Sequence, residues 1–280
     1  MGETMELIKY PRTPHLEGSR LQPGDEDLFQ VRFSEIAGRH LAVEEKCDGA
    51  NSAVSFSEDG KLLLQSRGHY LTGGGRERHF NLMKQWANVH KDAFYEVLGT
   101  RYIMYGEWMY AKHSVFYDRL SHYFLEFDIL DRRNGKFLDT PSRRKLTDRL
   151  PVVSVPVLKE GRFSDKKTLL SLIGASNFIS SRQTEVLKEI CLRSGLAPER
   201  QCQETDLCGM MEGLYIKVEE GGFVVDRLKY VRASFVQCVC NSGVHWLDRP
   251  IIPNQLAYPV DALFEPELPG KKEKTTCRKI

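Results

Sequence analysis

Apolar residues come in short runs along most of the chain, separated by Gly, Asn and Asp, which is typical of strands joined by tight turns. The clearest turns are Glu58-Asp59-Gly60 and Asn134-Gly135, the second leading into a strand at Phe137. Because strands joined by tight turns run in opposite directions, we expect a largely antiparallel sheet. The other predicted strands are residues 41–43, 53–56, 62–65, 102–107, 123–130, 213–218 and 222–231.

Apolar residues spaced three and four apart predict helices between some of these strands. Leu82, Trp86 and Val89 lie on such a stripe, which spans residues 81–98 and predicts one amphipathic helix packed on the sheet. Residues 233–241 fit a helix or a strand equally well. Helices interleaved with antiparallel strands, without an internal repeat, indicate an α+β fold. Further helices are predicted over residues 142–150, 166–172 and 182–194.

The chain of 280 residues is long enough for one main domain and a small appendage. Residues 1–40 are rich in Pro, Gly and charge and predict an irregular lead-in, with order beginning near residue 41. The main domain is predicted over 41–232 and a small C-terminal cap over 233–264. Residues 265–280 contain prolines and a lysine-rich end, and we expect no regular structure there.

Composition narrows the class of protein without identifying it. The net charge is +2, so a nucleic-acid surface would need local clustering of basic residues and not a globally basic field. No run approaches the ~20 apolar residues of a membrane span, and the first residues lack the apolar core of a secretory signal. The seven cysteines have no CxxC spacing, so we expect reduced thiols. These features favour a cytoplasmic protein with no membrane partner.

The most informative motif is Lys46-Cys47-Asp48-Gly49, where a lysine follows a predicted strand directly and precedes a turn. A lysine in that position is exposed at the floor of a pocket. To attack phosphorus its amine must be neutral, which requires a pKa lowered by burial or by nearby cations such as a bound metal. An isolated KxDG match is more often a solvent-exposed lysine that opens a turn. A catalytic role for Lys46 therefore depends on further motifs in the sequence.

Five further motifs follow in sequence order, and together they favour a catalytic role for Lys46 over a solvent-exposed lysine. With the lysine motif they resemble the covalent nucleotidyltransferase superfamily of ATP-dependent ligases and capping enzymes, over roughly residues 40 to 232. The motifs are Ser66-Arg67-Gly68, Tyr105-Gly106-Glu107-Trp108, Phe124-Leu125-Glu126-Phe127-Asp128, Glu212-Gly213-Leu214-Tyr215-Ile216-Lys217 and Arg227-Leu228-Lys229.

Within that superfamily the sequence is most similar to RNA ligases of the phage double-strand-sealing type and their bacterial relatives. Asn51 lies five residues past Lys46, as in those ligases, and the motif at Glu107 continues into Ala111-Lys112-His113-Ser114. About fifty residues follow Lys229, too few for the oligonucleotide-binding barrel that DNA ligases and capping enzymes append. The resemblance therefore implies an adenylation domain of antiparallel sheets flanked by helices, with no full barrel.

The resemblance also implies roles for individual residues. Lys46 would form a phosphoramide with AMP and release pyrophosphate, while Glu45 would read the adenine edge. Phe127 would stack on the adenine, with Phe124 as the second choice, because alternation along one strand predicts one core ring and one stacking ring. The nucleotide-binding residues are predicted to be Glu45, Asn51, Arg67, Glu107, Phe127, Glu212 and Arg227.

Cations and a metal would complete the site. Lys217 and Lys229 are predicted as catalytic cations that neutralise phosphate charge, although solvated strand faces are their alternative reading. Arg227 stands where related ligases often have a lysine, and arginine favours positioning a phosphate. Glu107 and Glu212 are the predicted metal ligands. Mg²⁺ is expected, with Mn²⁺ as an alternative, because Mg²⁺ needs only one or two carboxylates plus phosphate oxygens.

The function that follows is ATP-dependent RNA ligation in RNA repair. A lysyl-AMP intermediate would adenylylate a 5′-phosphate RNA end, which then joins a 3′-hydroxyl. The expected partners are RNA with those ends and an end-healing kinase or phosphatase. Three alternatives stay open: an mRNA-capping guanylyltransferase, a DNA ligase, and a nucleotide- or nucleic-acid-binding protein that lacks the chemistry.

Overall fold

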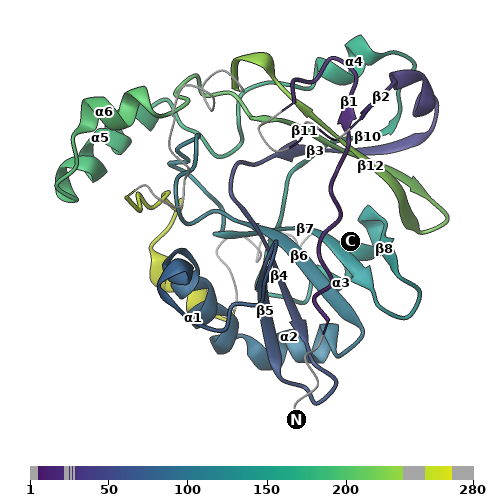
Figure 1. Ribbon diagram of the computed structural model, residues 1–280, viewed down its shortest axis with the longest axis horizontal. Coiled ribbons are helices and arrows are strands. Elements are labelled where there is room, and N and C mark those ends of the chain that lie inside the picture. The colour runs from purple at the N-terminus through teal and green to yellow at the C-terminus, as the bar shows by residue number, and fades with distance from the viewer. Residues whose placement is uncertain (1–5, 22–24, 26, 28, 236–249, 267–280) are drawn as a thin grey trace, which may run out of the picture.

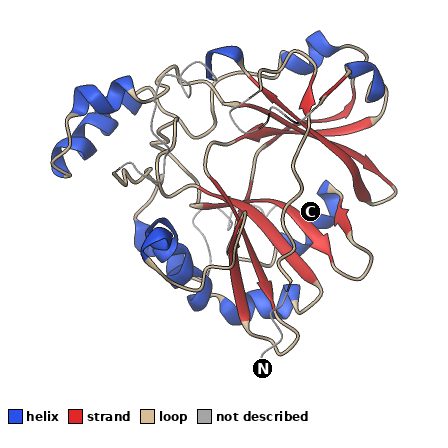
Figure 2. Ribbon diagram, viewed as in Figure 1, coloured by secondary structure: helices blue, strands red, loops and turns tan. Residues whose placement is uncertain are grey.

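A computed structural model of the chain describes residues 6–21, 25, 27, 29–235 and 250–266. The predicted α+β fold is confirmed: strands form one extended open sheet, and helices cover parts of its faces (Figure 2). Every strand predicted from the sequence is present. The strands are β1 (His15–Leu16), β2 (Gln30–Val31), β3 (His40–Lys46), β4 (Ala50–Phe56), β5 (Leu62–Ser66), β6 (Tyr102–Trp108), β7 (Phe124–Asp131), β8 (Lys136–Leu138), β9 (Val153–Ser154), β10 (Val157–Arg162), β11 (Gly213–Glu220) and β12 (Phe223–Val231).

The sheet has two halves, as Figure 1 shows. Neighbouring strands follow the order β10-β3-β11-β12-β8-β7-β6-β4-β5, and all of these pairs are antiparallel. The short β8 connects the halves, because it pairs with β12 on one side and with β7 on the other. No closed barrel occurs in the part of the chain that the structure describes. The two halves therefore leave a space between them, and β3 ends beside it.

Helices cover the half of the sheet that contains β4 to β7. The helix α1 (Asn81–Val89) places Trp86 in the core, where its ring stacks on that of Phe124 with centroids 5.2 Å apart. The single helix predicted over 81–98 is wrong in one respect: it is two helices, broken at His90, whose Nε2 lies 2.7 Å from the carbonyl oxygen of Leu263. The α-helices are α1 (Asn81–Val89), α2 (Lys91–Leu98), α3 (Thr140–Thr147), α4 (Lys166–Leu170), α5 (Gln183–Arg193) and α6 (Pro198–Gln203).

The other half shows why its strands form where they do. Along β3, Leu41 and Val43 point into an apolar core that they share with Leu214, whereas Glu44 and Lys46 alternate onto the opposite face. That face looks toward the space between the halves. Strand alternation thus separates the residues that hold β3 in the sheet from those that are available for chemistry.

The N-terminal segment differs from the expectation that order begins near residue 41. Residues 10–19, here called the N-terminal strap, have little regular structure but cross both halves of the sheet (Figure 1). Tyr10, Thr13 and His15 are buried, and β1 adds to β12 as a parallel strand. The strap contacts residues from the far end of the chain, and the pattern of apolar residues near it contains no signal for those contacts.

The described part of the expected C-terminal cap packs on the loop between β6 and β7. The side chain of Asn254 is fully buried, donates to the Met109 carbonyl oxygen at 2.7 Å and accepts from the Tyr117 backbone N–H at 2.9 Å. A short 3₁₀ helix over Val260–Phe264 then contacts α1. Most of the segment 233–241 and the tail from 267 onward lie outside the described residues. No helix in the described ranges is long and apolar enough to cross a membrane.

Candidate active site

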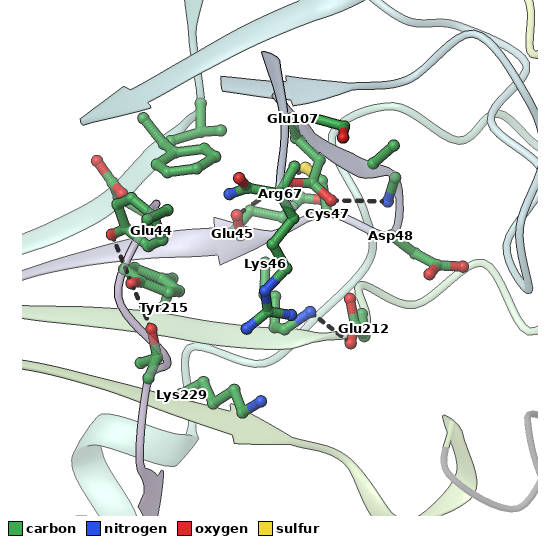
Figure 3. A pocket seen from close by; sticks show the side chains of 18 of the residues that line it. Glu44, Glu45, Lys46, Cys47, Asp48, Arg67, Glu107, Glu212, Tyr215 and Lys229 are labelled. Atoms are coloured by element: carbon green, nitrogen blue, oxygen red, sulfur yellow. Dashed lines mark hydrogen bonds and ion pairs between the residues drawn. The ribbon is translucent and has the colours of Figure 1, made fainter. Parts of the chain in front are cut away.

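A cavity of about 570 Å³ lies between the two halves of the sheet, at the end of β3. Its volume is within the range of small-molecule binding sites. Figure 3 shows Lys46 reaching from β3 toward Glu212, with Lys229 on the strand beyond. The predicted site residues that line the cavity are Glu45, Lys46, Asn51, Arg67, Glu107, Phe127, Glu212 and Lys229.

Lys46 is held against Glu212 by the pairing of two strands. In the antiparallel register of β3 and β11, Lys46 is opposite Gly213, so Glu212 lies next to the lysine. The Lys46 Nζ is 2.6 Å from Glu212 Oε1. Gly213 allows this approach, because a Cβ at that position would be 1.8 Å from the carbonyl oxygen of Tyr230 on β12. The glycine of the motif is therefore a packing requirement of the strand that carries Glu212.

Three carboxylates surround Lys46 and decide its charge. Burial disfavours the ammonium, but Glu212, Glu107 and Asp48 outweigh burial and raise the pKa of Lys46. Burial likewise raises the pKa of Glu107 to about 8, opposed by Lys46 and reinforced by the charges of Glu212 and Asp48. Burial also raises the pKa of Glu212. Near neutral pH the protein by itself thus keeps Lys46 protonated, which is opposite to the lowered pKa that nucleophilic attack requires.

The turn after Lys46 is fixed by backbone hydrogen bonds. Asp48 accepts from the backbone N–H groups of Ser114 and Val115 at 2.7 and 2.9 Å, and its own N–H donates to the Tyr117 hydroxyl at 2.8 Å. The Gly49 N–H donates to Glu107 at 3.2 Å. The segment that continues the Glu107 motif therefore holds the lysine turn in place, a structural role that its resemblance to RNA ligases did not specify.

The carboxylates of Glu107 and Glu212 repel each other, and a bound divalent cation would stabilise both. The charge of Glu212 raises the pKa of Glu107, and a cation between the two carboxylates would relieve that repulsion. Within the described ranges, no cluster of three or more His, Cys, Asp and Glu side chains forms a ready metal site. This donor set suits Mg²⁺ or Mn²⁺, because Mg²⁺ takes one or two carboxylates and completes its shell with water and phosphate oxygens.

A carboxylate and an aromatic ring, residue types that can bind a nucleobase, line the cavity at Glu45 and Phe127. Glu45 is 1% exposed, and its carboxylate accepts from the Ser176 hydroxyl at 2.5 Å and from the Asn177 side-chain amide at 2.7 Å. Phe127 is half-buried and lines the cavity, whereas Phe124 is fully buried in the core. Alternation along β7 thus separates the two rings as the sequence predicted.

The N-terminal strap supplies cavity residues that the sequence did not indicate. Tyr10 and Thr13 line the cavity beside Tyr215. The Tyr215 hydroxyl is 2.7 Å from that of Tyr10 and 2.9 Å from that of Thr13, and the Tyr10 hydroxyl also donates to Asp128. Tyr215 comes 205 and 202 residues after Tyr10 and Thr13, and Asp128 comes 118 residues after Tyr10, so no local motif could have found these contacts.

A family model for RNA ligases matches residues 39–231, which is more than half of the chain. The chain belongs to the RNA ligase family. A search of curated proteins found no match to this RNA ligase family member.

Solved structures with a similar fold include variants of an RNA ligase from Naegleria gruberi. One, solved with ATP and Mn, superposes with a TM-score of 0.52 at 17% identity and covers 82% of this chain and 58% of the other. An apo variant gives 0.54 at 14% identity, covering 84% and 58%. A variant with AMP and Mn gives 0.52 at 16% identity, covering 82% and 57%. This RNA ligase family chain thus spans less than two thirds of the length of those proteins.

Two predicted site residues of this family member are not brought to the cavity. Lys217 is fully buried, with Nζ 2.9 Å from Glu44 Oε2 and 3.2 Å from Asp128 Oδ1. The Arg227 Nε is 3.8 Å from Asp128 Oδ2, and its guanidinium carbon lies 4.2 Å from the ring centroid of Phe137. Neither residue lines the cavity. Buried carboxylates hold the Lys217 ammonium, and a carboxylate and an aromatic ring hold the Arg227 guanidinium.

Lys217 belongs to a buried charge cluster that joins the two halves of the sheet. We use this name for Glu44, Glu126, Asp128, Arg143 and Lys217, all with fully buried side chains. Arg143 on α3 lies 2.5 Å from Glu44 on β3 and 2.8 Å from Glu126 on β7. Lys217 on β11 connects Glu44 with Asp128. Glu44 also lines the cavity, so the cluster connects the cavity with strands of both halves.

Proposed function

We propose that the chain is an ATP-dependent RNA ligase in which Lys46 becomes covalently bonded to AMP. The observation that carries this proposal is the position of Lys46, at the end of a strand, in contact with Glu212 and at the floor of a nucleotide-sized cavity in a chain of the RNA ligase family. Nucleophilic catalysis by lysine needs a base within hydrogen-bonding reach of the amine. Glu212 is at that distance.

In the first step the Lys46 ammonium loses one proton to solvent, and the resulting amine attacks the α-phosphorus of ATP. A nitrogen–phosphorus bond forms, the bond from that phosphorus to the pyrophosphate oxygen breaks, and Glu212 takes the second proton from the nitrogen. A carboxylate whose pKa is raised toward neutrality is a matched acceptor for that proton. Lys229, which lines the same cavity, neutralises charge on the departing pyrophosphate.

The adenine and the metal would contact different residues of the cavity. Phe127 stacks on the adenine and Glu45 accepts from its amino group at one end of the cavity. Glu107 and Glu212 would hold Mg²⁺ or Mn²⁺. The cation would neutralise charge on the phosphates and lower the pKa of Lys46. The Naegleria gruberi structures with ATP and Mn and with AMP and Mn support this choice of nucleotide and metal.

The later steps use the same adenylate. AMP passes from Lys46 to the 5′-phosphate of an RNA end, and a 3′-hydroxyl then displaces AMP and seals the strand. We expect this in RNA repair, downstream of a kinase or phosphatase that heals the ends. The described cysteines Cys47, Cys191, Cys202 and Cys208 are free thiols, which is consistent with the reducing cytoplasm as the compartment.

Labelled nucleotides test the proposal directly. The protein is incubated with [α-³²P]ATP or [α-³²P]GTP and Mg²⁺, and adducts are resolved on a denaturing gel and located by mass spectrometry. We expect an adduct with ATP on Lys46, none with K46A, and an unchanged adduct with K188A, because Lys188 is an exposed residue of α5. Joining assays then compare nicked RNA, nicked DNA and single strands.

Each alternative function has its own result. An adduct with GTP alone would indicate a capping guanylyltransferase, and sealing confined to DNA nicks would indicate a DNA ligase. No adduct with either nucleotide, or an adduct that persists in K46A, overturns the proposal.

A further inference from the structure

The N-terminal strap pairs with the strand that carries Lys229. In the parallel register of β1 and β12, His15 is the partner of Lys229, and the Lys229 N–H donates to the Pro14 carbonyl oxygen at 2.9 Å. Figure 1 shows the strap reaching β1 beside β12. This backbone pairing brings the first residues of the chain to the phosphate end of the cavity.

A carboxylate close to the strap forms an ion pair with Lys229. The ammonium of Lys229 donates to Asp25 Oδ2, and the two side chains are 10% and 11% exposed. Lys229 lines the cavity, whereas Asp25 does not. Asp25 is thus a nearly buried counterion outside the cavity lining, and it belongs to none of the sequence motifs.

His15 fixes the orientation of the Asp25 carboxylate. The Val231 N–H donates to Ser19 Oγ at 2.9 Å, so the Ser19 hydroxyl proton can be donated to His15 Nδ1, 2.7 Å away. Nδ1 then accepts, and the proton of the neutral ring is on Nε2, which donates to Asp25 Oδ2 at 3.2 Å. His15 is fully buried, and burial lowers its pKa, so the ring is neutral and leaves the Asp25 charge for Lys229.

Lys229 needs such a counterion because its surroundings oppose a positive charge. Burial lowers the pKa of Lys229 and the nearby Lys46 lowers it further, whereas Asp25 and Glu212 raise it. Glu212 is already paired with Lys46. Arg12 also faces Asp25, at 3.6 Å from Oδ1, but the same arginine forms a pair of hydrogen bonds with Asp27. Asp25 is therefore the carboxylate in contact with Lys229.

We propose that Asp25, oriented by His15, is a positioning residue for lysine adenylation that keeps Lys229 charged and directed into the cavity. The inference rests on the proposed function. It assigns to the N-terminal segment a part in the reaction: the segment supplies the charge that lets a second lysine act as a cation a short distance from Lys46. Asp25 itself does not line the cavity and acts through Lys229.

The pH dependence of adenylation tests this role. Without the Asp25 charge, Lys229 loses its proton at a lower pH, so the alkaline limb of the single-turnover adenylation rate should move toward acid in D25N. We expect a displacement of about one pH unit, which is about a tenfold lower rate on that limb. The acid limb, which reflects the proton transfer from Lys46 to Glu212, should stay in place.

Three further variants separate this effect from a general loss of structure. D25E keeps the charge and should restore the position of the alkaline limb, while D25S is a second neutral variant if D25N does not fold. D27N is the matched control, because Asp27 is 67% exposed and pairs with Arg12 outside the cavity. Thermal unfolding is measured for each.

The outcomes are distinct. A wild-type alkaline limb in the neutral variants, or an equal loss of rate at every pH, overturns the role of Asp25 while the wild-type adduct leaves the proposed function intact. Absence of the adduct in the wild type overturns the proposed function and this inference with it.

Discussion

Replacing Lys217 by methionine tests whether Lys217 is a catalytic cation, as its motif implies, or a structural residue of the buried charge cluster, as its contacts indicate. The Lys217 ammonium is within 3.2 Å of carboxylate oxygens of both Glu44 and Asp128, and all three side chains are fully buried. K217M leaves those carboxylates buried without their shared cation. Removing one partner of a buried ion pair costs about 3–5 kcal/mol, because the remaining charge is uncompensated.

Urea unfolding measures this cost. With a slope of about 3 kcal/mol/M, the upper end of the usual range, a loss of 3–5 kcal/mol lowers the unfolding midpoint by about 1 M or more. K188M is the matched control, since Lys188 is exposed on α5 and a surface change of this kind stays within about 0.5 kcal/mol. E44Q combined with K217M should recover part of the loss, because the double variant also removes one of the two carboxylate charges that Lys217 neutralised.

Lysine adenylation by the folded fraction of K217M should fall less than about tenfold, because Lys217 does not line the cavity. The opposite pattern would refute the structural assignment: an unfolding midpoint like that of K188M together with a loss of adenylation above about a hundredfold. Lys217 would then be a cation that reaches the phosphates, as its motif predicts.

Two further predictions concern the residues around Lys46. The pKa of Glu107 is raised to about 8, so between about pH 5 and 8 this carboxyl is protonated in the folded protein but ionised in the unfolded chain. The free energy of unfolding, measured in urea, should therefore fall as pH rises through this range. E107Q should flatten this decline, and a decline as steep as that of the wild type would contradict the assignment. G213A should lower both stability and adenylation, because its Cβ would lie 1.8 Å from the Tyr230 carbonyl oxygen and push β11 away from β12; unchanged unfolding and an unchanged adduct would show that the strands tolerate the methyl group.

Local patterns were sufficient for most of the sheet and for the centre of the site. The turn after Lys46, the alternation that separates Phe124 from Phe127 and the strand that follows Glu212 are all set by neighbours in sequence. Each is visible as a run of residue types, because a strand and its turn depend on a few adjacent side chains. The cavity contains the lysine of the KxDG motif, together with the aromatic ring and the two carboxylates that the resemblance to RNA ligases implies.

Features that depend on distant partners could not be predicted in the same way. Lys217 alternates onto the face that carries Tyr215, yet its burial is decided by Glu44 from β3 and Asp128 from β7. The N-terminal strap is rich in Pro and charge, so its composition resembles that of a loop, and its burial follows from pairing with β12. The break at His90 likewise depends on a carbonyl oxygen that comes 173 residues later.

The contact between Asp25 and Lys229 joins residues 204 positions apart, and this separation affects how the molecule acquires its shape. Contacts between remote segments form slowly, since the entropy of closing a long loop must be overcome before they stabilise anything. During synthesis, the β4–β5 hairpin and the helices after it can associate early, whereas β1 cannot pair with β12 until β12 has left the ribosome. A nascent chain therefore carries Lys46 long before it can complete the phosphate end of the cavity, so competence for nucleotide transfer arises as one of the last events of folding.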